Sequence, residues 1–251
     1  MRRVLLTRSQ ADNVRLADQL QARGIASQSL PLLDLQPLEE TPQQRSLMLD
    51  LDRYHAVMVV SPTAARLGLQ RLDAYWPQPP AGQYWFAVGA GTAAPLADYG
   101  LPVQYPQQGQ DSEALLALPV WGELLQQDGL RVLIWRGEGG REHLANQVRA
   151  AGGQIDYLEL YRRQPGTGLV SGLAAAEAAG VTDILLLSSQ ALRFWQQAAA
   201  ERWAEQARWR CWVPSERVAT LARAAGCTDV RVCAGADDAA LIAAISTDHM
   251  S

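Results

Sequence analysis

The chain has 251 residues, of which 48% are apolar and 19% are charged, and its formal net charge is −4. This length is enough for two domains with buried cores, and the composition is ordinary for a globular protein. The acidic balance argues against a general nucleic-acid binder, and no apolar run approaches the roughly 20 residues of a membrane span.

In the first half of the chain, short apolar runs alternate with amphipathic segments. The run 4–7 predicts a strand, and the segment 9–24 predicts a helix that stops at Gly24. By the same criteria we expect strands at 27–35, 55–62 and 101–106, a strand that runs into a glycine-rich turn at 84–92, and helices that begin at residues 63, 92 and 111. The last of these helices has Asp111 or Ser112 as its expected cap.

The second half repeats the alternation. Strands are predicted at 131–135, 156–163, 183–189, 210–215 and 229–234, and helices at 140–153, 190–203, 216–226 and 237–245. Apolar strands that alternate with amphipathic helices indicate α/β domains with parallel sheets.

An internal repeat relates the two halves. Residues 4–37 align without a gap to 132–165, and 12 of these 34 positions are identical. The match continues downstream, where 55–66 pairs with 182–193. A period of this length is that of a domain and not of a solenoid unit. The sequence therefore predicts two similar lobes with a cleft between them.

Polar and glycine residues follow the predicted strands in both lobes. Ligands of open parallel sheets bind at the carboxyl ends of strands, so these positions are candidate contacts for an anionic ligand. Helix capping is the competing interpretation for each of them. The candidates are Arg8, Ser61, Thr63, Gly89, Thr92, Arg136, Ser188, Ser189, Ser215 and Arg217.

The cysteines and histidines give no sign of a metal centre. Cys211, Cys227 and Cys233 lack the spacing of a zinc site or a disulfide framework, and the three histidines are scattered. The amino-terminal segment has no signal-peptide pattern. We expect a cytoplasmic protein.

Several short motifs together resemble uroporphyrinogen-III synthase. They are VLLTR, SPTAA, VGAGTAA, DSEALL, WRGEGGREHL, YLELYRR and LLLSSQAL, which run in this order from Val4 to about Ile245. Each is weak alone, but their order, their spacing and the chain length make the resemblance specific.

The resemblance implies two flavodoxin-like parallel-sheet domains joined by a two-stranded β-ladder. One domain would combine 1–34 with 167–251, the other would be 39–162, and the linker strands would be 35–38 and 163–166. The implied reaction cyclises the linear tetrapyrrole hydroxymethylbilane to uroporphyrinogen III, with loss of water and inversion of ring D. No metal or organic cofactor is implied. The expected protein is a monomer whose substrate is a small polycarboxylate, and we expect no nucleic-acid or membrane partners. A transient contact with the enzyme that produces hydroxymethylbilane is compatible with this expectation.

Tyr161 is the predicted catalytic residue. Its counterpart in the repeat is Leu33, so the duplication does not require a phenol there. By resemblance, its hydroxyl would hydrogen-bond or protonate the departing hydroxyl of the substrate. Packing beside the linker is the competing interpretation, and Tyr157 is a weaker candidate on the same strand.

Arginines and hydroxyl groups would bind the acetate and propionate arms. The arginines are Arg8, Arg136, Arg141 and Arg217, each of which could instead be a solvated surface residue. The sequence departs from the family at VPSERVA, where Ser215 keeps one hydroxyl and Glu216 replaces a second. We expect Glu216 to point away from an anionic substrate.

Two other functions fit a two-lobed α/β chain. A cytoplasmic binding protein could close on a small anionic ligand, although receptors of that kind usually carry a signal peptide. An electron carrier or phosphoacceptor domain lacks support, because the chain has no P-loop and no paired acidic cluster. The segment 88–93 resembles a dinucleotide fingerprint but lacks the third glycine.

Overall fold

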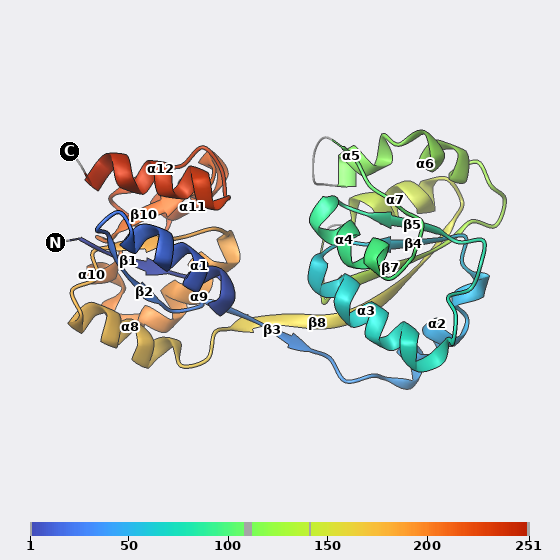
Figure 1. The fold of residues 1–251 in the computed structure, drawn as a ribbon, viewed down its shortest axis with the longest axis horizontal. Coiled ribbons are helices and arrows are strands. Elements are labelled where there is room, and N and C mark those ends of the chain that lie inside the picture. Colours follow the sequence, from blue (N-terminus) through green and yellow to red (C-terminus); the bar gives the residue numbers. More distant parts are fainter. Residues whose placement is uncertain (1, 108–111, 141, 250–251) are drawn as a thin grey trace. The chain divides into compact units, whose positions relative to one another are not determined.

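The computed structural model describes residues 2–107, 112–140 and 142–249. The chain divides into two compact units: Met1–Asp34 with Gln164–Ser251 (unit 1), and Leu35–Arg163 (unit 2). Each unit contains a sheet of mainly parallel strands with helices packed on both faces (Figure 1). The predicted α/β class is confirmed. The assignment of separate linker strands at 35–38 and 163–166 stays a prediction.

Unit 1 has a five-stranded sheet in the order β11-β10-β9-β1-β2. Taken along the chain this is the order 2-1-3-4-5, as in flavodoxin-like folds. Its elements are β1 (Arg3–Leu6), α1 (Gln10–Gln21), β2 (Ala26–Ser29), α8 (Leu169–Ala178), β9 (Asp183–Leu185), α9 (Ser189–Ala199), η2 (Ala200–Arg202), α10 (Trp203–Gln206), β10 (Arg210–Val213), α11 (Glu216–Ala224), β11 (Val230–Val232) and α12 (Asp238–His249).

The sheet of unit 1 is buried on both faces. Helices α8, α9 and α11 pack on one face around Trp195, which stacks on Trp209 with ring centroids 6.0 Å apart. Helices α1 and α12 cover the other face, where Leu16 and Leu241 are fully buried. The clustered tryptophans of this unit therefore belong to its core. The three cysteines are free and buried.

Unit 2 has the sheet order β3-β8-β7-β4-β5-β6, in which β3 lies antiparallel to β8 and the other neighbours are parallel. Its elements are β3 (Leu33–Pro37), α2 (Pro42–Leu49), η1 (Leu51–Arg53), β4 (Ala56–Val59), α3 (Pro62–Tyr75), β5 (Tyr84–Ala87), α4 (Ala90–Asp98), β6 (Val103–Gln104), α5 (Ser112–Leu116), α6 (Pro119–Leu124), β7 (Arg131–Gly137), α7 (His143–Ala150) and β8 (Gln154–Pro165). Helices α2, α3 and α4 pack on one face of the sheet and α5, α6 and α7 on the other.

Repeat counterparts occupy equivalent places in the two sheets. β7 and β8 correspond to β1 and β2, and β4, β5 and β6 correspond to β9, β10 and β11. The order β8-β7-β4-β5-β6 therefore matches β2-β1-β9-β10-β11. The two units share one topology, although the chain runs through it from different starting points.

Some predicted bounds are wrong. The expected strand 27–35 is two strands, β2 and β3, which lie in different sheets because the chain turns at Leu30–Leu32. The segment 84–92, expected as a strand that runs into a glycine-rich turn, has its strand at Tyr84–Ala87, and Gly89 is then the N-cap of α4. The cap predicted at Asp111 or Ser112 cannot be assigned, because Asp111 and the side chain of Ser112 lie outside the described part of the chain.

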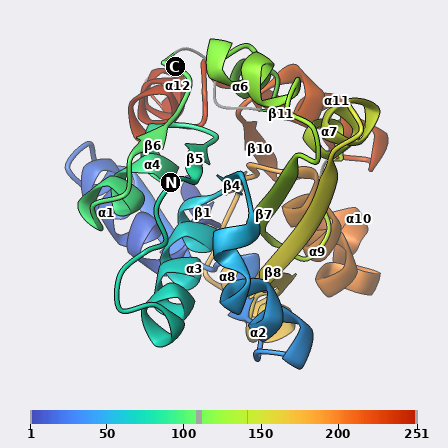
Figure 2. The same cartoon turned by 90° about the vertical axis from the view of Figure 1, so that its right-hand side faces the viewer.

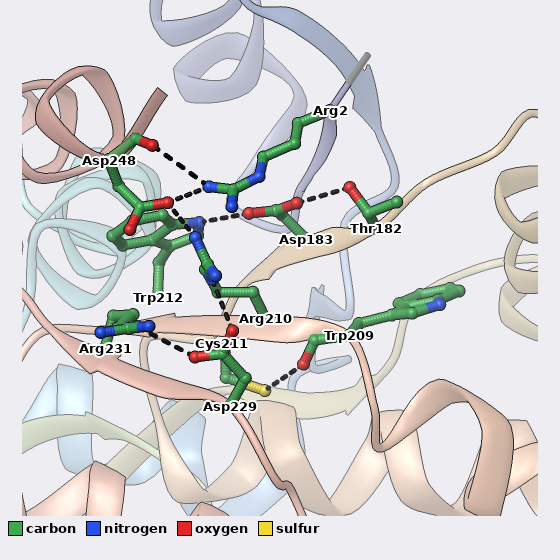
Figure 3. Close-up of polar contacts among 10 residues, drawn as sticks. All are labelled: Arg2, Thr182, Asp183, Trp209, Arg210, Cys211, Trp212, Asp229, Arg231 and Asp248. Carbon is green, nitrogen blue, oxygen red and sulfur yellow. Dashed lines mark hydrogen bonds and ion pairs between the residues drawn. The ribbon is translucent and has the colours of Figure 1, made fainter. Parts of the chain in front are cut away.

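A polar cluster in unit 1 lies at the amino ends of the strands (Figure 3). Asp183, the first residue of β9 and only 2% exposed, accepts hydrogen bonds from the Trp212 indole at 3.1 Å and from the Thr182 hydroxyl at 2.6 Å. Arg210, the first residue of β10, pairs with Asp229 at 2.6 Å and with Asp248 of α12. These charges fasten the last helix to the sheet, at the edge opposite to the strand carboxyl ends.

Candidate active site

The two central strands of each sheet mark the expected ligand position. In unit 2 the chain leaves β4 toward β5 and leaves β7 toward β8, so their carboxyl ends form a topological switch point. The corresponding pair in unit 1 is β9 and β1. Side chains at these two points are the candidates that the topology favours.

Tyr161 reaches the switch point of unit 2 through a β-bulge. Along β7 and β8, which run side by side (Figure 2), Arg136 lies opposite Glu159 but Gly137 lies opposite Tyr161. Leu160 is thus an extra residue on β8. A bulge of this kind moves the side chain that follows it to the opposite face of the sheet. Tyr161 consequently points to the face that carries α3, where it packs in the core with Leu158 and Leu160.

Gly137 provides the space that the Tyr161 ring occupies. A β-carbon built on Gly137 would lie 2.6 Å from Cε2 and 2.7 Å from Cζ of the ring. Real β-carbons do not approach other atoms so closely, and therefore only glycine at this position lets the ring lie across β7 toward β4. The φ of Gly137 lies outside the left-handed region, so the requirement for glycine is steric and not conformational.

Ser61, which follows the end of β4, is a hydrogen-bond partner of the Tyr161 hydroxyl. The Ser61 Oγ lies 3.0 Å from the Tyr161 hydroxyl oxygen. The same Oγ accepts the backbone N–H of Ala64 at 3.0 Å and so caps α3. Pro62 occupies the first position of this helix, where its missing N–H costs nothing. The predicted pair Ser61 and Tyr161 is therefore brought into contact, beside the positive end of the α3 dipole.

Arg163 also contacts the phenol. Its Nη2 donates to the Tyr161 hydroxyl at 3.2 Å, and its guanidinium carbon lies 5.4 Å from the ring centroid. Tyr161 is only 1% exposed. Sequence reasoning missed Gly137 and Arg163 as partners of this tyrosine. The bulge places Tyr161 opposite Gly137, whereas Arg163 follows two residues later on the same strand and therefore shares its face.

The remaining predicted residues of unit 2 lie near helix starts or on β7. Thr63 is half-buried in the first turn of α3, Gly89 is the N-cap of α4, and Thr92 is buried in the first turn of α4. None of them has a hydrogen bond with Tyr161 among the contacts of the described residues.

Arg136 is occupied by two carboxylates. Its Nη1 donates to Glu142 at 2.9 Å, its Nη2 donates to Glu159 at 3.1 Å, and its guanidinium stacks 3.6 Å from the Tyr157 ring centroid. The Tyr157 hydroxyl donates to Glu142 in turn. Hydrogen bonds from Tyr157 and then Arg136 lower the pKa of Glu142 from 4.5 to about 2. Arg136 is thus a neutralised part of a surface network, with 11% of its side chain exposed.

This network predicts an acid-sensitive contribution to stability. The folded-state pKa of Glu142 is depressed, so its contribution is present above about pH 4.5 and is lost as the pH falls toward about 2. We expect the unfolding free energies of wild type and Glu142→Gln to differ near neutrality and to converge across that window. Urea titrations at a series of pH values measure the difference. A gap that stayed constant down to about pH 2 would exclude the network as its source.

In unit 1 the predicted residues separate into two groups. Ser188 caps α9 by accepting the Ala191 N–H at 3.1 Å, and Ser189 is exposed beside it. Arg8, with 12% of its side chain exposed, is engaged by Asp238 and the carbonyl of Ala236. It therefore binds the start of α12, and a free guanidinium is not offered there.

The start of α11 contains the other two predicted residues. Ser215 is the N-cap residue but makes no side-chain cap bond, and Arg217 is exposed with no side-chain partner among the described residues. Glu216 is exposed and pairs with Arg223 at 3.3 Å. Arg141 lies outside the described residues.

A hollow on the surface of unit 2 is a poor site for a polycarboxylate. It measures about 720 Å³ and lies over β3, α2 and β8. Four carboxylates line it, from Glu39, Glu138, Asp156 and Glu159, against one arginine, Arg162, which is paired with Glu138 at 3.0 Å. An anion would be repelled there.

The described residues include no group of three or more His, Cys, Asp or Glu side chains arranged to hold a metal ion. In the same part of the chain, no helix combines the length and apolar character needed to cross a membrane.

Comparison with known proteins decides the family. The model of uroporphyrinogen-III synthase HemD matches residues 14–243. The chain belongs to the uroporphyrinogen-III synthase family. It is 34% identical to the uroporphyrinogen-III synthase of Salmonella typhimurium over 96% of this chain and 99% of that protein. It is 32% identical to that of Escherichia coli with the same coverage.

Solved structures with the same fold are also synthases of this family. A mutant uroporphyrinogen III synthase of Thermus thermophilus covers 100% of this chain and 98% of its own, with a TM-score of 0.64 and 16% identity. The Helicobacter pylori enzyme covers 98% and 99%, with a TM-score of 0.63 and 14% identity. The resemblance predicted from the motifs is confirmed, and a non-enzymatic binding protein is not favoured.

Proposed function

We propose that this chain converts hydroxymethylbilane to uroporphyrinogen III. Membership of the family over nearly the whole chain supports the reaction. The observation that carries the site is the Tyr161 hydroxyl, held 3.0 Å from Ser61 at the switch point of unit 2. A phenol placed beside a helix N-terminus is a suitable proton donor, and the substrate brings the remaining reactive groups itself.

The reaction needs positioning more than a strong nucleophile. As the C–O bond of the hydroxymethyl group breaks, Tyr161 passes a proton to the departing hydroxyl, which leaves as water, and the pyrrole nitrogen supplies the electrons that form an azafulvene cation. The substituted carbon of ring D then attacks and a spiro intermediate rearranges with inversion of that ring. A proton lost from carbon balances the one that was donated. Holding a flexible chain for this attack is the main entropic task of the protein.

Substrate carboxylates are assigned to helix starts and to free cations. Backbone N–H groups and hydroxyls at the starts of α3, α4, α9 and α11 suit anions. The residues proposed to bind there are Ser61, Thr63, Gly89, Thr92, Ser188, Ser189, Ser215 and Arg217. Arg8 and Arg136 stay in the proposal as residues that hold neighbouring elements in place, since carboxylates already neutralise both.

A monomeric state, a cytoplasmic location and independence from metal and organic cofactors belong to the same proposal. So does a transient contact with the enzyme that releases hydroxymethylbilane.

Product analysis tests this function. Purified protein is supplied with freshly generated hydroxymethylbilane, and the isomers are separated after oxidation to porphyrins. We expect the type III isomer to dominate and to form faster than spontaneous closure. Type I product alone, at the spontaneous rate, would overturn the assignment, and tight binding without turnover would leave the two-lobed binding protein.

A further inference from the structure

Within the described part of the chain, Arg163 is the one exposed cation that touches the phenol of Tyr161. It donates to the hydroxyl at 3.2 Å and lies 5.4 Å from the ring centroid. Among residues 2–107, 112–140 and 142–249 no carboxylate pairs with it. Its neighbour Arg162 differs in this respect, because it is paired with Glu138 at 3.0 Å.

The burial of Tyr161 makes this contact informative. A proton donor must come within hydrogen-bond distance of the substrate, yet Tyr161 is 1% exposed. Most of the ring is covered by the core of unit 2, which does not move cheaply. The guanidinium of Arg163 is the cover that can move, since it is attached to an exposed, flexible side chain.

A carboxylate competes strongly for such a guanidinium. The bond from Arg163 goes to a neutral phenol, whereas an arginine–carboxylate pair is charge-assisted and often bidentate. Among the described residues, Arg163 forms no ion pair with a carboxylate of the protein. Binding a substrate carboxylate would therefore break only its weak hydrogen bond with Tyr161.

We propose that Arg163 binds a carboxylate arm of the substrate and, by leaving Tyr161 to do so, uncovers the hydroxyl for proton transfer. This inference rests on the proposed function and assigns to it a carboxylate-binding residue absent from the sequence predictions. Access to the acid is thereby tied to the arrival of a carboxylate, and a neutral linear pyrrole would be a poor substrate.

The first test uses chemical modification and needs no turnover. Tyrosine nitration by tetranitromethane is followed by mass spectrometry on folded wild type, Arg163→Gln and Arg162→Gln, without substrate. We expect nitration at Tyr161 to be at least about fivefold faster in Arg163→Gln than in the other two proteins. Equal protection in all three would overturn the cover, whatever reaction the protein catalyses.

Steady-state kinetics test the carboxylate contact. Loss of one charge-assisted bond predicts that Arg163→Gln raises KM for hydroxymethylbilane about tenfold while kcat stays within about twofold. Arg163→Lys retains a cation and should return KM to within about threefold of wild type. Arg162→Gln is the matched control and should leave both constants unchanged. If Arg163→Gln behaves like Arg162→Gln while wild type makes the type III isomer, this inference fails and the proposed function stands.

Discussion

Gly137→Ala is expected to remove most of the activity of the protein. The new methyl group would lie 2.6 Å from Cε2 and 2.7 Å from Cζ of Tyr161. The ring cannot withdraw into the core, because that core is fully packed around it. It must therefore move off β7, and the 3.0 Å contact with Ser61 is lost. We expect kcat to fall about 10- to 100-fold, as for loss of a general acid of modest effect, and the unfolding free energy to fall by about 1–3 kcal/mol.

Gly122→Ala is the matched control for this substitution. Gly122 lies on helix α6 of the same unit, and nothing stands within 4 Å of the position of its β-carbon. Its replacement should leave kcat unchanged and raise stability by up to about 1 kcal/mol through helix propensity. In a Tyr161→Leu background the ring is absent, so Gly137→Ala should cost little stability. If Gly137→Ala lowered the unfolding free energy as much in the Tyr161→Leu background as in wild type, the Tyr161 ring would not be the group for which Gly137 provides space.

Gly68→Ala is expected to give the largest loss of stability among single methyl additions in unit 2. Gly68 faces the sheet from helix α3, and a β-carbon there would lie 2.1 Å from Cε3 and 2.4 Å from Cζ3 of Trp135. Trp135 is fully buried on β7 and packs edge-to-face on Trp85, with centroids 5.2 Å apart. Neither the indole nor the helix has free space, so we expect a loss of about 3 kcal/mol, at the upper end for overpacking.

Helix propensity alone predicts the opposite sign. Alanine is more favourable than glycine inside a helix by about 1 kcal/mol, so a stabilised Gly68→Ala variant would refute close packing of α3 on β7. Chemical denaturation of wild type, Gly68→Ala and Gly122→Ala measures the difference. Adding Trp135→Leu to Gly68→Ala should recover part of the loss, since the indole is the group that the methyl meets.

The arrangement of strands could be predicted because it depends on local patterns. Continuous apolar runs such as 56–60 indicate strands buried on both faces, and the duplication extends this prediction from one lobe to the other. The predicted strand 27–35 was wrong because its leucines continue through the turn. Pro31 is the residue that marks the passage from one sheet to the other, since proline interrupts a strand interior.

The surroundings of Tyr161 could be predicted only in part. Comparison of the repeat singled out Tyr161, since Leu33 stands at the equivalent position, and Ser61 followed from its place after a buried strand. The role of Gly137 depends on one extra residue in β8, and no sequence pattern marks that bulge. Arg163 stands two residues after Tyr161, so regular strand alternation places both on one face. Arg8 and Arg136 look like free cations in the sequence, because their acidic partners lie up to 230 residues away.

The central claim is that the phenol of Tyr161 donates the proton that releases water. The most direct measurement compares kcat and KM of wild type and Tyr161→Phe, with unfolding free energies measured on the same samples. Phenylalanine keeps the ring in its place over Gly137 and removes only the hydroxyl. We predict a kcat about 10- to 100-fold lower with KM within about twofold, and a smaller change for Tyr157→Phe, whose hydroxyl bonds Glu142. A Tyr161→Phe protein that turns over at the wild-type rate would contradict this role.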